Sequence, residues 1–146
     1  MISNLKDQLL RDEGLRLQLY KDSRSIWTIG VGHNVEANPL PFDISHGISF
    51  VQAFQILDED IARVSAKLFA ALPWVRTLDL VRQGVFLNMS FNLGVGGLLE
   101  FHHDLADTQA GNYAQAAADM KASAWYSQVG ERAQRLCQQM ISGDWK

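Results

Sequence analysis

The sequence contains little cysteine, little proline and no long apolar run. Cys137 is the only cysteine, so no disulfide can form within the chain. It lies in a helical pattern with no neighbouring group that would lower its pKa, which is typical of a buried small apolar residue and not of a nucleophile. With only three prolines, 47% apolar and 20% charged residues, the composition excludes a disordered or fibrous protein.

The N-terminal segment lacks the features of a secretory signal. MISNLKDQLLRDEG is amphipathic and charged, without the apolar stretch of a signal peptide. No window approaches the roughly 18 apolar residues that a membrane-spanning helix needs. We therefore expect no stable membrane association, and a protein that stays in the cytoplasm where it is made until another factor releases it.

The chain also lacks a basic patch and a metal-binding pattern. The net charge is -3, and the acidic residues concentrate in the middle of the chain while both ends are mildly cationic. This distribution argues against nucleic-acid binding. The four histidines show no ligand spacing, and adjacent histidines in a helix point apart. We therefore expect no metal and no cofactor; the four histidines are His33, His46, His102 and His103.

The first third of the chain has the pattern of one helix followed by strands. Ser3 is the expected N-cap of a helix over residues 1–13, and Gly14 is its expected end. Leucines then alternate with polar or aromatic residues from Leu15 to Tyr20, a period of two that indicates a strand. A polar turn and a β-rich segment follow, so we expect a small antiparallel sheet within residues 15–33.

The rest of the chain has helical patterns. Ser49 and Gln52 form a capping-box pattern at the start of a long helix over about 50–71. Four further helices are expected in LDLVRQGVFLNMSFNLG, in VGGLLEFHHDLADTQ, after the caps Asn112 and Gln115, and in SQVGERAQRLCQQMISG. The apolar stripe of the long helix is predicted to comprise Phe50, Ala53, Phe54, Leu57, Ile61, Val64 and Leu68.

These patterns predict a single domain of the α+β fold class. Its parts are an N-terminal lobe of about 14–50 with a small antiparallel β-sheet, a connecting helix of about 50–71, and a helical C-terminal lobe of about 74–146 packed with helix 1–13. The length of 146 residues suits one such domain.

Three acids near the first helix differ in their expected surroundings. At about 100° per residue, Glu13 falls inside the apolar stripe of the helix and Asp12 on its flank. Burial and the negative end of the helix dipole would both raise the pKa of Glu13, as a general acid at neutral pH requires. Asp22 lies in the KDSRS turn, where it should remain ionised. A helix-end glutamate turned to solvent and a turn-forming aspartate are the structural alternatives.

Two carboxyl groups whose surroundings move their pKa values apart are typical of glycoside hydrolysis. The residues that follow them support this interpretation. The hydroxyl of Thr28 could hold a water, and Gly30 and Gly32 would allow the backbone to approach a ligand closely. A Gly-x-Gly pair alone is equally typical of a β-bulge.

The complete pattern resembles the catalytic segment of the bacteriophage-type lysozymes, the endolysin muramidases. It comprises Glu13, Asp22, Thr28 and Gly30-x-Gly32-His33. The resemblance continues through NMSFNLG, SAWYSQVGERAQRL and the GDW near the end, and so covers essentially the whole chain. It implies a lysozyme-like fold with an active-site cleft between the lobes.

The resemblance also implies roles for individual residues. Glu13 would be the general acid that protonates the glycosidic oxygen, and Asp22 would activate or orient the attacking water with the help of Thr28. Arg132 matches an arginine that faces the catalytic glutamate. His33 matches a histidine beside the catalytic aspartate, although a purely structural histidine is an equal alternative.

The expected substrate-binding residues are Phe91, Gly30 and Asn34. Phe91 matches a cleft residue that contacts sugar, but its pattern alone is that of an ordinary core residue. Asn34 is a departure, because the best-known relative has an apolar residue there.

Further departures affect the expected surroundings of the glycan. Asp104 and Asp119 replace neutral polar residues, which leaves subsite specificity open. Arg24 and Ala124 replace an acid and its arginine partner, so an ion pair at the cleft mouth is not expected.

The resemblance implies hydrolysis of the β-1,4 bond between N-acetylmuramic acid and N-acetylglucosamine in peptidoglycan, by an inverting single displacement. The implied partners are peptidoglycan glycan strands, with a monomeric enzyme released by a holin without direct binding. Two alternatives are a peptidoglycan-binding module that kept the fold without catalysis, and a lytic transglycosylase. An intact Glu13, Asp22 and Thr28 argue against the first, and a water-positioning pair argues against the second.

Overall fold

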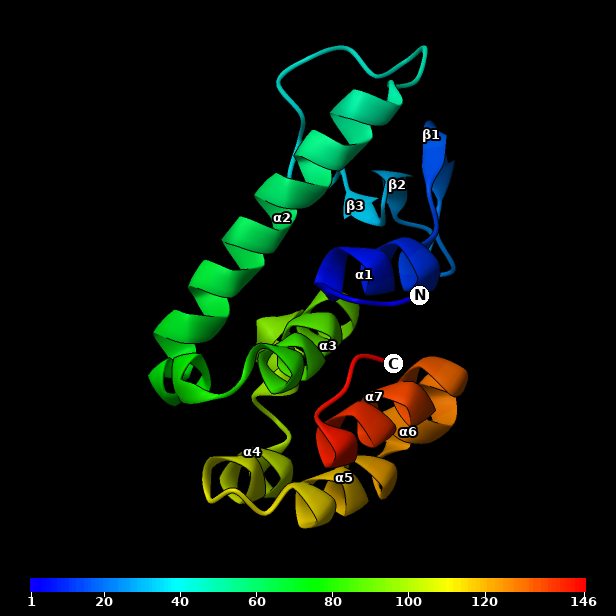
Figure 1. The fold of residues 1–146 in the computed structure, drawn as a ribbon. Coiled ribbons are helices and arrows are strands. Elements are labelled where there is room, and N and C mark those ends of the chain that lie inside the picture. Colours follow the sequence, from blue (N-terminus) through cyan, green and yellow to red (C-terminus); the bar gives the residue numbers. More distant parts are fainter. The chain divides into compact units, whose positions relative to one another are not determined.

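The computed structural model describes residues 1–146 and confirms the α+β class (Figure 1). A three-stranded sheet near the N-terminus is followed by helices to the end of the chain. In order, the elements are α1 (Leu5–Glu13), β1 (Arg16–Lys21), β2 (Trp27–Gly30), β3 (His33–Asn34), α2 (Phe50–Ala71), the 3-10 helix η1 (Pro73–Thr77), α3 (Leu80–Leu98), α4 (His102–Gln109), α5 (Tyr113–Lys121), α6 (Ala124–Val129) and α7 (Glu131–Ser142). None of the helices is both long and apolar enough to cross a membrane.

The chain forms two compact units. The sheet unit is Leu9–Arg63, and the helical unit is Met1–Gln8 with Val64–Lys146. Helices α1 and α2 each contribute residues to both units. The expected lobe limits, about 14–50 and about 74–146, stay predictions.

The sheet is antiparallel in the order β1-β2-β3 and lies within the sheet unit. Its register is irregular between Arg16 and Tyr20, which breaks the expected alternation along β1. Leu19 is therefore exposed, while Tyr20 is partly buried. A bulge of this kind moves each later side chain to the opposite face of the strand.

The core of the sheet unit joins β2 to the start of α2. Its buried members are Ile29, Ile48, Ala53 and Ile56. The capping box at α2 is confirmed: the Ser49 N–H donates to Oε1 of Gln52 at 2.9 Å, and the Gln52 N–H donates to Oγ of Ser49 at 3.1 Å.

The predicted apolar stripe of α2 is wrong at two residues, which are exposed and not buried. Phe50 is 58% exposed and Phe54 36% exposed. Phe50 is the first residue of the helix and has no preceding turn to pack against. Phe54 lies at the edge of the stripe, because the buried positions centre on Leu57, Asp60 and Val64.

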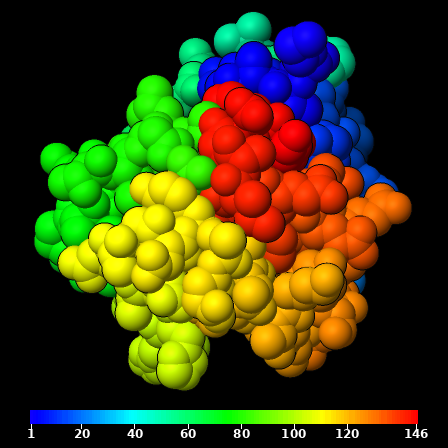
Figure 2. All heavy atoms as spheres, turned by 60° about the horizontal axis from the view of Figure 1, so that its bottom comes forward, coloured from blue at the N-terminus to red at the C-terminus, as the bar shows by residue number.

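The helical unit has a larger core to which every helix from α3 to α7 contributes. Phe86, Met89, Leu98, Met120, Leu136 and Met140 are fully buried in it. Helices α4 and α5 pack together, and α5 packs on α7. Figure 2 shows the outer side of these helices, from yellow to red, as a continuous surface.

Several helix boundaries differ from the sequence-based expectation. Asn4, not Ser3, caps α1, since its Oδ1 accepts the Asp7 N–H at 3.0 Å. Helix α3 is kinked at Gly94, where φ is 76°, and α4 starts only at His102. The segment from residue 95 to 109 is therefore not one helix, because α3 ends at Leu98 and Phe101, with φ of -81° and ψ of 60°, interrupts the helical backbone before α4.

The last two helices are also separate where one was expected. Gly130 has a φ of 74° and separates α6 from α7. Asn112 occupies the N-cap position of α5, but its side chain makes no capping hydrogen bond, and Gln115 bonds to Asp119 instead. The expected ends at Gly14 and Gly143 are confirmed by φ values of 75° and 71°.

Candidate active site

Glu13 is the last residue of α1, and its side chain lies directly against the turn between β2 and β3. A Cβ placed on Gly32 would be 2.8 Å from Oε2 of Glu13 and 3.0 Å from its Cβ and Cδ. Gly32 also has a φ of 63°, a conformation that side chains rarely adopt. Glycine is therefore needed at this position both for the turn and for the close approach of the Glu13 carboxyl.

Gly30 serves the same turn in a different way. Its φ is 67°, but an added Cβ would meet Ile48 and Ala53 only at ordinary contact distances of 3.6 and 3.8 Å. The conformation of the turn, and not space, favours glycine here. A glycine at residue 30 thus fixes the path of the backbone into the segment that contacts Glu13.

Asp22 organises the turn between β1 and β2. Its Oδ1 accepts the N–H of Arg24 at 2.8 Å and the N–H of Ile26 at 3.0 Å, and Arg24 lies 3.9 Å from its other oxygen. The hydrogen bond from Ile26, above all, lowers the pKa of the Asp22 carboxyl. Asp22 is therefore ionised at neutral pH, as the sequence predicted.

Thr28 is tied to Asp22 through one peptide unit. The Thr28 hydroxyl is buried and donates to the Ile26 carbonyl at 2.8 Å, and that same carbonyl accepts the N–H of Asp22 at 2.9 Å. This bond fixes the direction of the hydroxyl hydrogen, while the oxygen retains lone pairs with which to accept. The arrangement would suit a water held between Thr28 and the turn.

Tyr20 is a site residue that sequence reasoning missed. It pairs with Thr28 across the β1–β2 ladder, and the Arg16 guanidinium lies 4.5 Å from its ring centre. Burial raises the pKa of its phenol, and the negative charges of Glu13 and Asp22 raise it further. Tyr20 thus lies within electrostatic reach of both acids. Its position two residues before Asp22 was the only indication in the sequence.

His33 is bound on both ring nitrogens. Nδ1 lies 2.7 Å from Oδ2 of Asp60, and Nε2 lies 2.8 Å from the carbonyl oxygen of Asn38. Burial alone would lower the pKa of His33, but the hydrogen bond and charge of Asp60 outweigh it and raise that pKa. Arg63 binds the other oxygen of Asp60 at 2.8 Å. These contacts favour the structural alternative for His33.

Two further polar residues of the sheet unit contact near neighbours in the chain. The Asn34 Oδ1 accepts the Ala37 N–H at 2.9 Å and so closes the turn after β3. The side chain of Asp12 is only 1% exposed and lies 3.0 Å from Arg11. The helical wheel placed Asp12 on the flank of α1, and it did not foresee this burial.

In the helical unit, Arg132 is held by Asn88. Its Nε donates to the Asn88 side-chain oxygen at 2.8 Å, and its Nη2 lies 3.4 Å from the Asn88 carbonyl. Asn88 in turn donates to Gln8 at 3.4 Å, and Gln8 bonds to Gln139. This buried network was not expected from the sequence, because its members are far apart in the chain. It fixes the orientation of the guanidinium.

Phe91 belongs to the edge of the helical core. It is partly buried and packs against the buried cluster. An ordinary core residue would make these contacts, and the expected role of Phe91 in sugar binding stays a prediction.

No group of three or more His, Cys, Asp or Glu side chains is arranged to hold a metal ion. Cys137 is buried, which raises the pKa of its thiol to about 11.

Comparison with known proteins identifies the class to which this fold and site belong. The phage lysozyme family model matches residues 11–139, and the chain belongs to that family. Two similar relatives are the probable T4-type lysozymes 1 and 2 of Dictyostelium discoideum, each 29% identical to this chain. These alignments cover 98% and 100% of this chain and 96% and 98% of the relatives.

A third relative is larger. The pre-baseplate central spike protein Gp5 of Enterobacteria phage T4 is 27% identical over 97% of this chain, which corresponds to 28% of that protein. Membership of the phage lysozyme family supports the activity of a glycosidase of the muramidase type, with peptidoglycan as its substrate.

Proposed function

We propose that the protein cleaves the β-1,4 bond between N-acetylmuramic acid and N-acetylglucosamine by an inverting single displacement. The observation that carries the proposal is the placement of two carboxyl groups within electrostatic reach of Tyr20. Glu13 lies against Gly32 at the end of α1, while peptide N–H groups keep Asp22 ionised. A proton donor and an ionised acceptor on separate elements are what glycoside hydrolysis requires.

In the proposed reaction Glu13 gives its proton to the glycosidic oxygen as the bond to the anomeric carbon breaks. Asp22 accepts a proton from a water that attacks the opposite face of the sugar ring, and Thr28 accepts a hydrogen bond from that water. The configuration at the anomeric carbon is inverted. The geometry requires room for the water, so the two carboxyl groups should be about 6.5–9.5 Å apart in the complex with substrate.

The other expected site residues have supporting roles in this proposal. Gly32 lets the Glu13 carboxyl reach its position, and Gly30 and Asn34 shape the turn beside the glycan. Arg132 and Phe91 contribute a cation and an apolar face. Their direct contact with substrate is an expectation to be tested by variants at each position.

The test is release of reducing ends from purified peptidoglycan by the wild type, Glu13→Gln and Asp22→Asn. We expect a loss of about 10³-fold for Glu13→Gln and a comparable loss for Asp22→Asn, since both proton transfers are removed. Glu59→Gln, an exposed acid on α2, is the matched control and should retain full activity. Full activity in Glu13→Gln would contradict the proposal.

The same assay separates the two alternatives. A non-catalytic binding module would release no reducing ends above background from wild-type protein. A lytic transglycosylase would release 1,6-anhydro-muramic products, which mass spectrometry distinguishes from hydrolysed ones because they lack one water. The Asp22–Thr28 arrangement favours hydrolysis, since a transglycosylase needs no attacking water.

The proposed setting is that of an endolysin that acts on the wall of its host. The protein would accumulate in the host cytoplasm as a monomer and reach the peptidoglycan through a membrane hole made by a holin, without binding the holin. Expression in bacteria with and without a holin tests this: lysis should need the holin. Lysis without one would contradict the proposed release route.

A further inference from the structure

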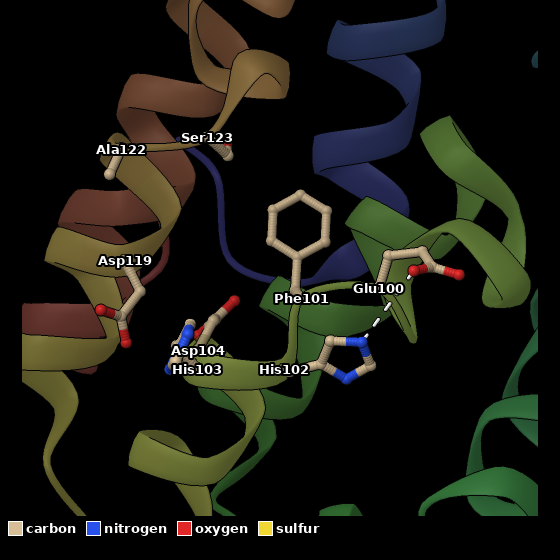
Figure 3. A pocket seen from close by; sticks show the side chains of 8 residues that line it. All are labelled: Glu100, Phe101, His102, His103, Asp104, Asp119, Ala122 and Ser123. Atoms are coloured by element: carbon tan, nitrogen blue, oxygen red, sulfur yellow. Dashed lines mark ion pairs between the residues drawn. The ribbon is translucent and has the colours of Figure 1, made fainter.

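The helical unit contains a pocket of about 330 Å³ formed by α4, the end of α5 and the turns that flank them (Figure 3). Phe101 stands in the middle of the view, with Ser123 above it and Asp104, Asp119 and His103 beside and below it. The pocket thus combines an aromatic wall with two carboxyl groups on different helices.

Asp104 is buried in the wall of this pocket with one oxygen unpartnered. The residue is 1% exposed, its Oδ1 accepts the Thr108 hydroxyl at 3.2 Å, and its Oδ2 has no hydrogen-bond partner. Figure 3 shows a carboxyl oxygen of Asp104 pointing into the space between Phe101 and Asp119. A buried carboxyl oxygen without a donor is costly, and such groups commonly mark a missing ligand or proton.

Asp119 adds a second unpartnered oxygen to the same pocket. Its Oδ2 is buried without a hydrogen bond, and its Oδ1 accepts the Gln115 amide at 3.1 Å. The neighbouring carboxylate of Asp119 raises the pKa of Asp107. The charged neighbours of these acids are therefore other acids, and no Lys or Arg pairs with them.

The remaining wall of the pocket offers complementary groups. Phe101 packs edge-to-face on Trp125 with ring centres 5.8 Å apart, and the Trp125 N–H donates to Asn92 at 2.7 Å. The Ser123 hydroxyl donates to the Met120 carbonyl at 2.6 Å, so its oxygen remains able to accept. An aromatic face beside acceptors and uncompensated carboxyl groups suits a cation.

We propose that this pocket binds a primary ammonium group carried by the peptidoglycan, and that Asp104 and Asp119 determine this specificity. An ammonium offers three donors, which matches the unpartnered oxygens of Asp104 and Asp119 and the acceptor of Ser123. A neutral group would leave the carboxyl groups uncompensated. The choice of peptidoglycan as the carrier rests on the proposed function, whereas the ammonium preference comes from the pocket itself.

Two parts of peptidoglycan can supply this group. One is the side-chain amine of a diamino acid in the stem peptide, and the other is the amine of a glucosamine that has lost its acetyl group. Both present the same –NH₃⁺, and separate probes can distinguish them.

Binding of a cation should be linked to release of a proton from Asp104. Burial raises the pKa of Asp104 to about 7, so the group is protonated in mildly acidic solution. A bound ammonium would stabilise the ionised form, and its affinity should therefore increase with pH between 5.5 and 8. The other titratable groups that face Asp104 or its neighbours are Asp107 and His103 on α4, Asp119 and Lys121 on α5, and Cys137 on α7.

The experiment is a calorimetric or NMR titration of the full chain at pH 8. One pair of probes is a stem tetrapeptide with a free side-chain amine and its N-acetylated counterpart. The second pair is a tetramer of glucosamine and a tetramer of N-acetylglucosamine. We expect the free amine of at least one pair to bind about tenfold more tightly than its acetylated counterpart, and the pair that shows the difference identifies the source.

Variants tie the preference to the pocket. Asp104→Asn and Asp119→Asn should each abolish the difference between free and acetylated probes. Glu100→Gln is the matched control, because Glu100 lines the same pocket but its side chain is 81% exposed, and it should keep the difference. Amide chemical shifts check that each variant is folded, and Asp119→Asn serves if Asp104→Asn is not.

Equal affinity for free and acetylated probes in both pairs at pH 8 would overturn the proposal. So would a preference for amines that survives in both aspartate variants, or one that does not weaken at pH 5.5. The tetrapeptides contain no glycosidic bond, so their binding is independent of hydrolysis. A failure of the reducing-end assay with an intact amine preference would contradict only the proposed function.

Discussion

Asp22 in the sheet unit and Asp104 in the helical unit are both aspartates, but their surroundings have opposite effects. Asp22 accepts two peptide N–H groups in a partly exposed turn, and its pKa is lowered. Asp104 is buried with one oxygen unpartnered, and its pKa is raised to about 7. Burial raises the pKa of Asp104, whereas hydrogen bonds from peptide N–H groups lower that of Asp22.

Asp60 is a buried acid of the sheet unit whose two oxygens both have partners. It is as deeply buried as many core residues, yet His33 and Arg63 bind its two oxygens at 2.7 and 2.8 Å. The sheet unit thus supplies partners to its acids, whereas the pocket of the helical unit leaves its acids uncompensated. That contrast separates the acids that support the fold from those that could recognise a ligand.

The largest expected effect concerns the contact between Gly32 and Glu13. Gly32→Ala should lower kcat/KM about 10²-fold, because the new methyl would displace the carboxyl from its position. Gly14→Ala is the matched control, since Gly14 also has a positive φ but an added Cβ would meet nothing within 4 Å. Both variants should lose about 1 kcal/mol of unfolding free energy, and only Gly32→Ala should lose activity. Equal activities in the reducing-end assay would show that the contact is not needed.

The next largest effect concerns Asp60, the buried acid of the sheet unit that His33 and Arg63 bind. Asp60→Asn should lower the unfolding free energy by about 3 kcal/mol at pH 5, because it removes the partner of a buried cation. The raised pKa of His33 gives stability that is complete below the usual histidine pKa and is lost as the pH rises through the folded value. The loss measured by urea unfolding should therefore be smaller at pH 8 than at pH 5. Glu59→Gln should show no such dependence, and an equal loss at both pH values would refute the ion pair.

Replacing Asp104 should have the opposite effect on stability to replacing Asp60. The folded chain holds a proton that the unfolded chain releases above its ordinary pKa of 3.8, so Asp104 makes the protein less stable as the pH rises from about 4 to about 7. Asp104→Asn should therefore be about 2 kcal/mol more stable than the wild type at pH 8, and close to it at pH 4. Urea unfolding at both pH values tests this, with Glu100→Gln as the control. A destabilised variant at pH 8 would mean that the ionised carboxyl has partners.

The smallest expected effect is that of Asp22 on stability. Its lowered pKa provides stability above the ordinary aspartate pKa of 3.8, and this is lost as the pH falls through the folded value. Asp22→Asn should lower the unfolding free energy by less than about 1 kcal/mol at pH 6, because the group is partly exposed. The difference between the two proteins should shrink as the pH is lowered below 3.8. A larger loss would give Asp22 a structural role beyond its turn.

Local features of the fold could be predicted from the sequence. The capping box of Ser49 and Gln52 and the helix ends at Gly14 and Gly143 depend on neighbouring residues only, and they are confirmed. The expected donors to Asp22 could be foreseen for the same reason, since they lie in its own turn.

Features that depend on distant contacts could not be predicted. The bulge in β1, which exposes Leu19 and buries Tyr20, follows from pairing with β2. The burial of Asp104 depends on how α4 packs with α5, and the Asn88–Arg132 contact joins residues 44 positions apart. The close contact of Glu13 with Gly32 likewise depends on the turn between β2 and β3 lying against the end of α1.

The anomeric configuration of the first product tests the central claim most directly, because it reports on which face the water attacks. Proton NMR during hydrolysis of a soluble glycan strand by the wild-type protein would follow the new reducing end before it mutarotates. Attack by a water that Asp22 and Thr28 position predicts the α-anomer as the first product from a β-linked strand. Initial appearance of the β-anomer would contradict the account, since it would require a covalent intermediate or attack on the same face.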